Sequence, residues 1–101
     1  MKYIKKFENN AEQTKKDIEN SKKFIIILYY GTRYEIIEIK HIREKENDVE
    51  AYYYDNYDFT KSDFLSYQDF IVIQSFDTFD DALKKYREII ELKNTMHKYN
   101  I

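Results

Sequence analysis

The chain has 101 residues, a formal net charge of −2 at pH 7, no cysteine, no proline and a single glycine. A length of about 100 residues suits one domain, so a single domain over residues 1–101 is expected. Without cysteine, disulfides, thiolate zinc sites and a cysteine nucleophile are all excluded. The longest apolar run, residues 24–30, is far shorter than the roughly 20 residues of a membrane helix. We therefore expect no membrane contact and a cytoplasmic location, in a bacterium or a phage-infected host cell.

The first expected element is a helix near the start of the chain. Residues of one helix face recur at intervals of three and four: Ile4, Phe7, Ala11, Thr14, Ile18 and Ser21. Half of them are small, so this helix either packs loosely or meets a partner.

A β-hairpin is expected next. Residues 24–30 show no polar alternation, which is typical of a strand covered on both faces. Gly31 and Thr32 predict a turn, and residues 33–43 predict the returning strand. The alternation of this second strand slips phase at Ile36 and Ile37, which predicts a β-bulge there.

The second half of the chain predicts two further strands and a long helix. Residues 49–54 are typical of a third strand, and residues 70–76 of a fourth. Residues 55–69 have no clean period and are expected to form a loop, with a short helical turn over 62–66 capped by Thr60. Thr78 or Asp77 is expected to cap the last helix. Its apolar face comprises Phe79, Ala82, Leu83, Tyr86, Ile89, Ile90, Lys93 and Met96.

These elements predict an α+β fold. Its sheet is antiparallel with about four strands, and an N-terminal and a C-terminal helix pack on it, in the order α-β-β-β-loop-β-α.

The charge distribution points to a binding surface. Residues 44–81 carry eleven acidic residues against Lys45 and Lys61, a net charge of −9, and they also contain many Tyr and Phe rings. Carboxylates and rings complement the basic, stacking surfaces of proteins that bind nucleic acid. The expected partner-binding residues are Glu46, Asp48, Glu50, Tyr52, Tyr54, Asp55, Tyr57, Asp58, Asp63, Tyr67 and Asp69.

The expected function is that of a small non-enzymatic binding protein with a basic protein partner. In size, acidic character and lack of cysteine the chain resembles small phage and mobile-element inhibitors of CRISPR or restriction systems, a resemblance of type that rests on no motif. The other interpretation of the acidic segment is an ordinary solvated surface that keeps the protein in solution, and the sequence leaves both open.

Catalytic patterns are lacking, so no enzymatic activity, cofactor or metal is expected. His41 and His97 have no second ligand at metal spacing. Gly31 alone cannot build a phosphate-cradling loop. Glu38 and Lys40 have the Glu-x-Lys form of metal-dependent nucleases, but the preceding strand supplies no acidic residue.

Three alternative functions remain, one of which is a small-molecule sensor, since an aromatic-lined sheet can hold an apolar ligand. The lysines of the two helices would serve direct nucleic-acid binding, which the acidic middle of the chain disfavours. Self-association through the Tyr-rich third strand and the first helix would give a homodimer. The sequence fixes neither the partner nor the oligomeric state.

Overall fold

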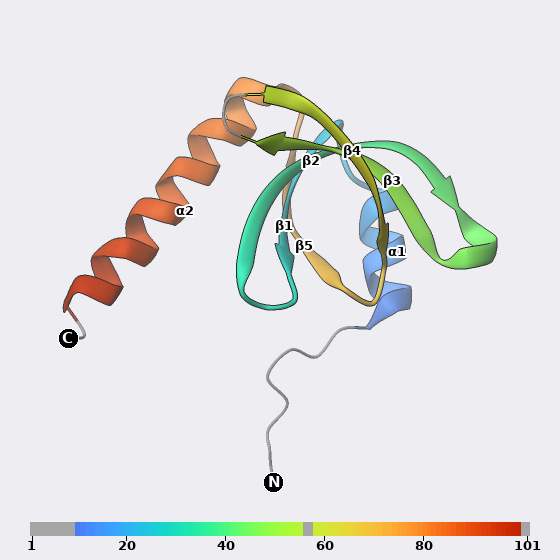
Figure 1. Cartoon of the computed structure of the whole chain (residues 1–101), viewed down its shortest axis with the longest axis horizontal. Coiled ribbons are helices and arrows are strands. Elements are labelled where there is room, and N and C mark those ends of the chain that lie inside the picture. The colour runs from blue at the N-terminus through green and yellow to red at the C-terminus, as the bar shows by residue number, and fades with distance from the viewer. Residues whose placement is uncertain (1–9, 56–57, 100–101) are drawn as a thin grey trace, which may run out of the picture.

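The computed structural model describes the backbone of residues 10–55 and 58–99, with side chains to residue 94. The five strands form one antiparallel sheet in the order β4-β3-β2-β1-β5 (Figure 1). The predicted α+β fold is confirmed, with one strand more than predicted. The elements are α1 (Ala11–Glu19), β1 (Phe24–Tyr29), β2 (Arg33–Arg43), the 3₁₀ turn η1 (Glu44–Glu46), β3 (Asp48–Asp55), β4 (Asp58–Ser66), β5 (Phe70–Phe76) and α2 (Phe79–Tyr99).

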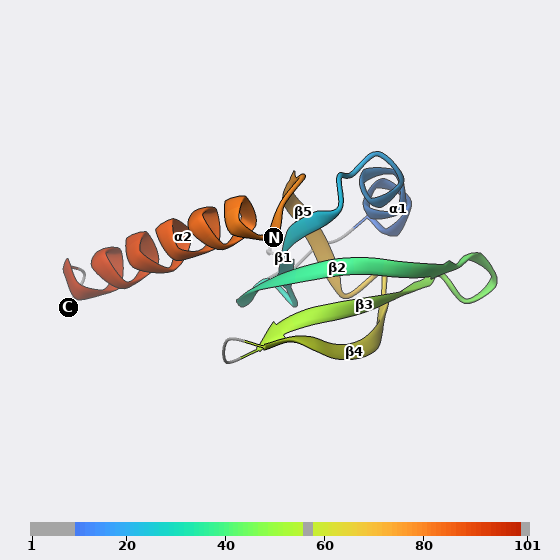
Figure 2. The same ribbon diagram turned by 90° about the horizontal axis from the view of Figure 1, so that it is seen from above.

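The sheet is strongly curled, and its two helices pack on opposite faces (Figure 2). Helix α1 packs its buried residues Thr14 and Ile18 on the concave face. It begins at Asn10, whose side-chain oxygen accepts hydrogen bonds from the backbone N–H groups of Glu12 (3.0 Å) and Gln13 (3.2 Å). The predicted face members Ile4 and Phe7 lie outside the described residues.

Strands β1 and β2 are buried on both faces. Ile25 and Ile27 of β1, with Ile37 of β2, belong to the core under α1. Ile26 and Ile36 point the other way, into the core under α2. The predicted strand covered on both faces is confirmed over Phe24–Tyr29, whereas Tyr30, the last residue of the predicted range, lies in the turn and is exposed.

The predicted bulge at Ile36 and Ile37 is wrong. These residues pair in regular register with Ile26 and Ile25 of β1. Each face of the sheet is covered by its own helix. Two consecutive residues of β2 can therefore both be apolar while their side chains still alternate between the two faces. The irregularity in β2 lies later, between Ile39 and His41, where the register with β3 shifts.

The predicted loop over residues 55–69 is also wrong for most of its length, because Asp58–Ser66 forms the edge strand β4. It pairs with β3 in a register that sets Leu65 opposite Val49 and Asp63 opposite Ala51. Its polar residues are mostly exposed, and this hides the period-two pattern of a strand. Thr60 lies within β4 and caps no helix.

The β1–β2 hairpin and the cap of α2 confirm two local predictions. Tyr30 and Gly31 have φ values of 53° and 70°, as a tight type I′ turn requires, and the Thr32 N–H donates to the Tyr29 carbonyl at 3.1 Å. The Thr78 hydroxyl oxygen accepts a hydrogen bond from the Asp81 N–H at 3.2 Å.

Helix α2 packs on the convex face near its start and extends past the sheet beyond that point (Figure 1). Ala82 is fully buried, whereas Leu92 is 62% exposed. The Lys93 ammonium donates to the Thr32 carbonyl at 3.2 Å and so ties the helix to the β1–β2 turn. Within the described residues, no helix is long and apolar enough to span a membrane.

The two-sided burial of β2 predicts that Ile36→Ala and Ile37→Ala each destabilise the fold strongly. Each removes a side chain that is at most 1% exposed, so we expect each to lower the free energy of unfolding by about 2–5 kcal/mol. Ile73→Ala on β5 is the matched control, because Ile73 is 40% exposed and should cost much less. Urea denaturation measures all three. A small loss for either β2 variant would contradict burial on both faces.

Candidate functional site

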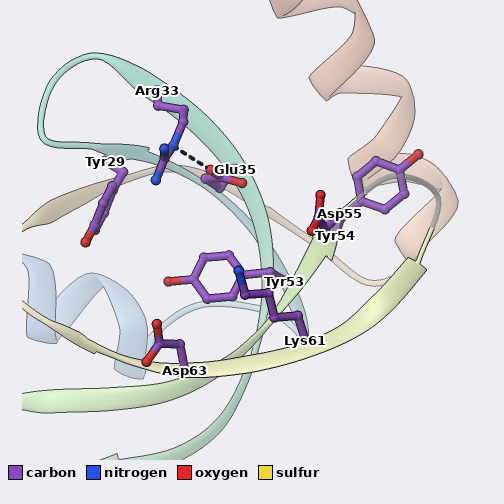
Figure 3. A pocket seen from close by; sticks show the side chains of 8 residues that line it. All are labelled: Tyr29, Arg33, Glu35, Tyr53, Tyr54, Asp55, Lys61 and Asp63. Atoms are coloured by element: carbon purple, nitrogen blue, oxygen red, sulfur yellow. Dashed lines mark ion pairs between the residues drawn. The ribbon is translucent and has the colours of Figure 1, made fainter.

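The concave face carries a cavity of about 280 Å³ in the part that α1 leaves uncovered. It lies over the β1–β2 hairpin and the end of the β3–β4 hairpin, and its polar side chains gather from all four strands (Figure 3). The lining residues are Tyr29, Arg33, Glu35, Tyr53, Tyr54, Asp55, Lys61 and Asp63.

The sheet register explains why these side chains meet. Residues directly opposite one another in an antiparallel pair project on the same face. Tyr29 is opposite Arg33, and Tyr53 is opposite Lys61. Tyr29 and Tyr53 also pack against the core under α1, so their rings are held by apolar neighbours on one side and border the cavity on the other.

Glu35 is the most buried charge of the cavity. Its side chain is only 19% exposed, and its Oε2 lies 2.7 Å from Arg33 Nε. Burial raises the pKa of the Glu35 carboxyl, the Arg33 guanidinium lowers it, and the charge of Asp55 raises it further; the net effect is upward. Glu35 therefore holds a negative charge in surroundings that only partly compensate it.

Tyr53 forms the adjacent wall. Burial, with a smaller contribution from the charge of Asp63, raises the pKa of the Tyr53 phenol well above its usual range. The Arg33 guanidinium lies 5.2 Å from the centre of the Tyr29 ring, within cation–π range.

Two carboxylates meet at the end of the β3–β4 hairpin. Asp55 and Asp58 are directly opposite one another in the register, and both are exposed. Like charges at such a position typically cost between about 0.2 and 1 kcal/mol. We therefore expect Asp55 and Asp58 to repel one another next to the cavity, where the charge of Asp55 also raises the pKa of Glu35.

The predicted partner-binding residues do not form one surface. Asp55 and Asp63 line the cavity, and Asp58 lies beside them. Glu50 and Tyr52 alternate with Ala51, which belongs to the core under α1, and therefore lie on the opposite face of β3.

On that opposite face, bases of β2 compensate the acids. The Arg43 guanidinium binds both carboxylate oxygens of Asp48, with Nε at 2.8 Å from one of them, and also contacts Glu46 at 2.9 Å. The Arg43 hydrogen bond and charge lower the pKa of the Asp48 carboxyl. Lys40 lies 4.7 Å from the centre of the Tyr52 ring. The net charge of −9 along residues 44–81 is therefore not the charge of one patch.

Four predicted residues remain. Tyr54 borders the cavity, but its ring packs against Phe79 in the core under α2, with 5.2 Å between ring centres. Tyr67 is 1% exposed, so its ring fills the interior. Asp69 lies in the β4–β5 turn, where its carbonyl accepts a hydrogen bond from the Tyr30 N–H. Tyr57 lies outside the described residues.

Sequence reasoning missed the contribution of the β1–β2 hairpin to this site. Tyr29, Arg33 and Glu35 come from a segment with little net charge, and Lys61 was counted only as a minor base. One available signal was the spacing of Arg33 and Glu35, two residues apart on a strand directly after the Gly31 turn, which places both on one face.

A metal site receives no support from the described part of the chain, where no group of three or more His, Asp or Glu residues is placed to hold an ion. The Glu-x-Lys pair is otherwise engaged. Glu38 lies 3.7 Å from Lys23, and Lys40 lies over Tyr52.

Comparisons with protein-family models, with curated proteins and with solved structures find no match to this chain. The geometry of the site therefore carries the functional argument.

The Asp55–Asp58 repulsion predicts that Asp58→Lys stabilises the protein. The change replaces a like-charged pair by an opposite one, so we expect a gain of roughly 0.2–1 kcal/mol in the free energy of unfolding. Asp58→Asn serves as control, because it removes the repulsion without adding attraction and should give a smaller gain. Both gains should shrink at high salt. A loss of stability on Asp58→Lys in urea denaturation would refute the proposed repulsion.

The opposite pKa shifts of Glu35 and Asp48 predict opposite pH dependences. The raised pKa of Glu35 means that the native state binds this proton more tightly than the unfolded state, so its charge costs stability as pH rises from about 4 to about 7. The free energy of unfolding of Glu35→Gln should therefore rise relative to that of the wild type as pH increases over this range. The pKa of Asp48 is lowered, so the stability that its charge contributes is present above about pH 4 and is lost as pH falls below that value. From about pH 2 to about pH 4 the wild type should therefore become more stable relative to Asp48→Asn as pH rises. Urea denaturation in each of the two pH ranges measures these effects, and the same sign for both variants would contradict the assignment.

Proposed function

We propose that this protein is a small non-enzymatic binding protein, and that it inhibits a protein partner by occupying a basic, nucleic-acid-binding site on it. One group of residues supports this proposal, and we call it the acidic hairpin end. It comprises four carboxylates and two rings, those of Glu35, Asp55, Asp58, Asp63, Tyr29 and Tyr53. Arg33 and Lys61 are the bases that line the same cavity. Four carboxylates against two bases give this end a net charge of −2.

The chemistry of the acidic hairpin end suits a cationic partner. A lysine or arginine between Asp55 and Asp58 would replace their repulsion by attraction. The half-buried Glu35 acts where the effective dielectric constant is below that of water, so a cation close to it gains more than at an open surface. The Tyr53 ring borders the cavity and can stack on a partner guanidinium, as the Tyr29 ring already does on Arg33 of the same chain.

This proposal includes a biological setting. Binding a basic groove with carboxylates in place of phosphates is the action of an anti-CRISPR or anti-restriction inhibitor of a phage or mobile element, at work in the cytoplasm of a bacterial or phage-infected cell. Such an inhibitor needs no cofactor and no catalytic group, only complementarity of charge and shape.

Direct binding to nucleic acid by the lysine-rich helices finds less support. Lys22 lies 3.7 Å from Asp77, and Lys85 lies 3.9 Å from Glu88. Lys22 lies after the end of α1 and Lys85 lies on α2, and lysines that share a surface with acids in this way are typical of a solvated face.

The proposal predicts that Asp55→Lys/Asp58→Lys loses the partner. Tagged wild-type protein should retain a basic protein from lysate of the source organism or its host, and the retained amount should fall as salt rises. The double variant should retain at least about tenfold less, because two attractions become repulsions. It should fold normally, since a like-charged pair replaces a like-charged pair.

The matched control is Glu88→Lys/Glu91→Lys, which makes the same change of net charge on the exposed face of α2. It should bind as the wild type does. Equal retention by the two double variants would contradict the proposed site, and salt-sensitive retardation of bare DNA or RNA in a gel shift would favour nucleic-acid binding instead.

A further inference from the structure

The two edges of the sheet differ in how they are protected. On β5, the Thr14 hydroxyl of α1 donates to the Phe70 carbonyl at 3.2 Å. Ile73 has no partner in the β1–β5 register, which passes from Gln74 directly to Val72, so β5 is bulged in its middle. Both features prevent a further strand from pairing with β5. On β4, residues 61–66 pair with β3 in regular register, and the register shifts only beyond Lys61, toward the Asp55–Asp58 end. Residues 61–64 are all exposed, and no helix among the described residues packs on them.

Hydrogen bonds fix which backbone groups of β4 point away from the sheet. The Tyr67 N–H donates to the Asn47 carbonyl at 3.0 Å, so the next pair, Ser66 with Asp48, is one whose backbone groups point outward. Alternation along the strand then places Phe64 and Ser62 outward as well. The Phe64 N–H confirms this, because it donates to the side chain of Asp63 at 2.7 Å.

We propose that a second copy of this chain pairs with the β4 edge, antiparallel and about a two-fold axis at Ser62. The outward-pointing Ser62 then pairs with Ser62 of the second copy, as the hydrogen-bonding alternation requires. In this register Lys61 is directly opposite Asp63 of the second copy, and Asp63 is opposite its Lys61. Moving the axis by one residue in either direction places two lysines or two carboxylates opposite one another.

The carboxylate of Asp63 has two alternative partners. In the single chain it accepts the Phe64 N–H and so occupies an outward donor of β4. In the pair, a carbonyl of the second copy accepts that N–H, and the Asp63 carboxylate turns to Lys61 of the second copy. The outward donor thus stays bonded in both states, which lowers the cost of leaving the edge open when no second copy is bound.

This pairing does not depend on the proposed function, but it bears on the same cavity. Lys61 and Asp63 line it, so each copy contributes a lysine and a carboxylate to the rim of its neighbour's cavity. Strand pairing continues the sheet, and the two cavities then lie on the same face of one ten-stranded sheet.

Exchanging the charges of Lys61 and Asp63 tests the proposal, with the dimerisation of each variant measured by analytical ultracentrifugation. We expect the wild type to pass from monomer to dimer as its concentration rises. Lys61→Asp and Asp63→Lys should each weaken dimerisation about tenfold, because each sets like charges opposite one another twice. The combined variant, Lys61→Asp/Asp63→Lys, should restore it. Lys84→Asp on α2 is the control and should dimerise as the wild type does.

The absence of cysteine allows a second, geometric test. Ser62→Cys places two thiols across the axis, about 5.5 Å apart between Cα atoms, so a short bis-maleimide should join the copies. Thr60→Cys is the matched control, since its two copies are separated by about 14 Å along the strands. A wild type that stays monomeric at every concentration, a combined variant that fails to recover, or equal cross-linking at both positions would each overturn the proposal. Asp55→Lys/Asp58→Lys should still dimerise, which separates this outcome from loss of the basic partner.

Discussion

The rest of the structure depends on burying both faces of the two central strands. Five successive side chains of β1 are apolar, and β2 presents Ile36 to one face and Ile37 to the other. Each such side chain contributes about 1.5–3 kcal/mol when it is removed from water. A helix on each face is the simplest way to remove them all, and the chain supplies one before the sheet and one after it.

Incomplete cover by those helices creates the site. The described part of α1 has nine residues and packs near β5, which leaves the concave face open toward the β3–β4 hairpin. Tyr29 and Tyr53 stand at this border, with apolar contacts behind them and charged groups in front. Because the core holds their rings, the walls of the cavity are set before any partner arrives. Preorganisation of this kind lowers the entropy cost of binding.

The predictability of the elements followed the strength of their local signals. The apolar run of β1, the Gly31 turn and the Thr78 cap each act through their immediate neighbours, and each was correctly predicted. Strand β4 was missed because an edge strand with solvent on most of its residues needs no apolar alternation. Its pairing with β3 is a tertiary contact, and the composition of the segment alone does not predict it.

The charge of the candidate site was harder to predict than its location. The sequence shows eleven acids close together but not which face of the sheet each one takes. Register decides this: it sends Asp48 and Glu50 to the face where Arg43 lies, and Asp63 to the cavity. Tyr67 is buried in the fold, although its acidic neighbours in the sequence make it look like an exposed tyrosine. Local composition therefore does not predict which acidic side chains are paired with basic side chains of a neighbouring strand.

The bulge at Ile73 has a consequence for aggregation. Edge strands of proteins rich in aromatic residues are sites where chains add to one another without limit, as in amyloid. A molecule with two open edge strands would be able to polymerise, because each added molecule would expose a further open edge to the next. Here the β5 edge is bulged and partly covered by α1, so pairing through β4 would join two copies and leave no regular edge for a third.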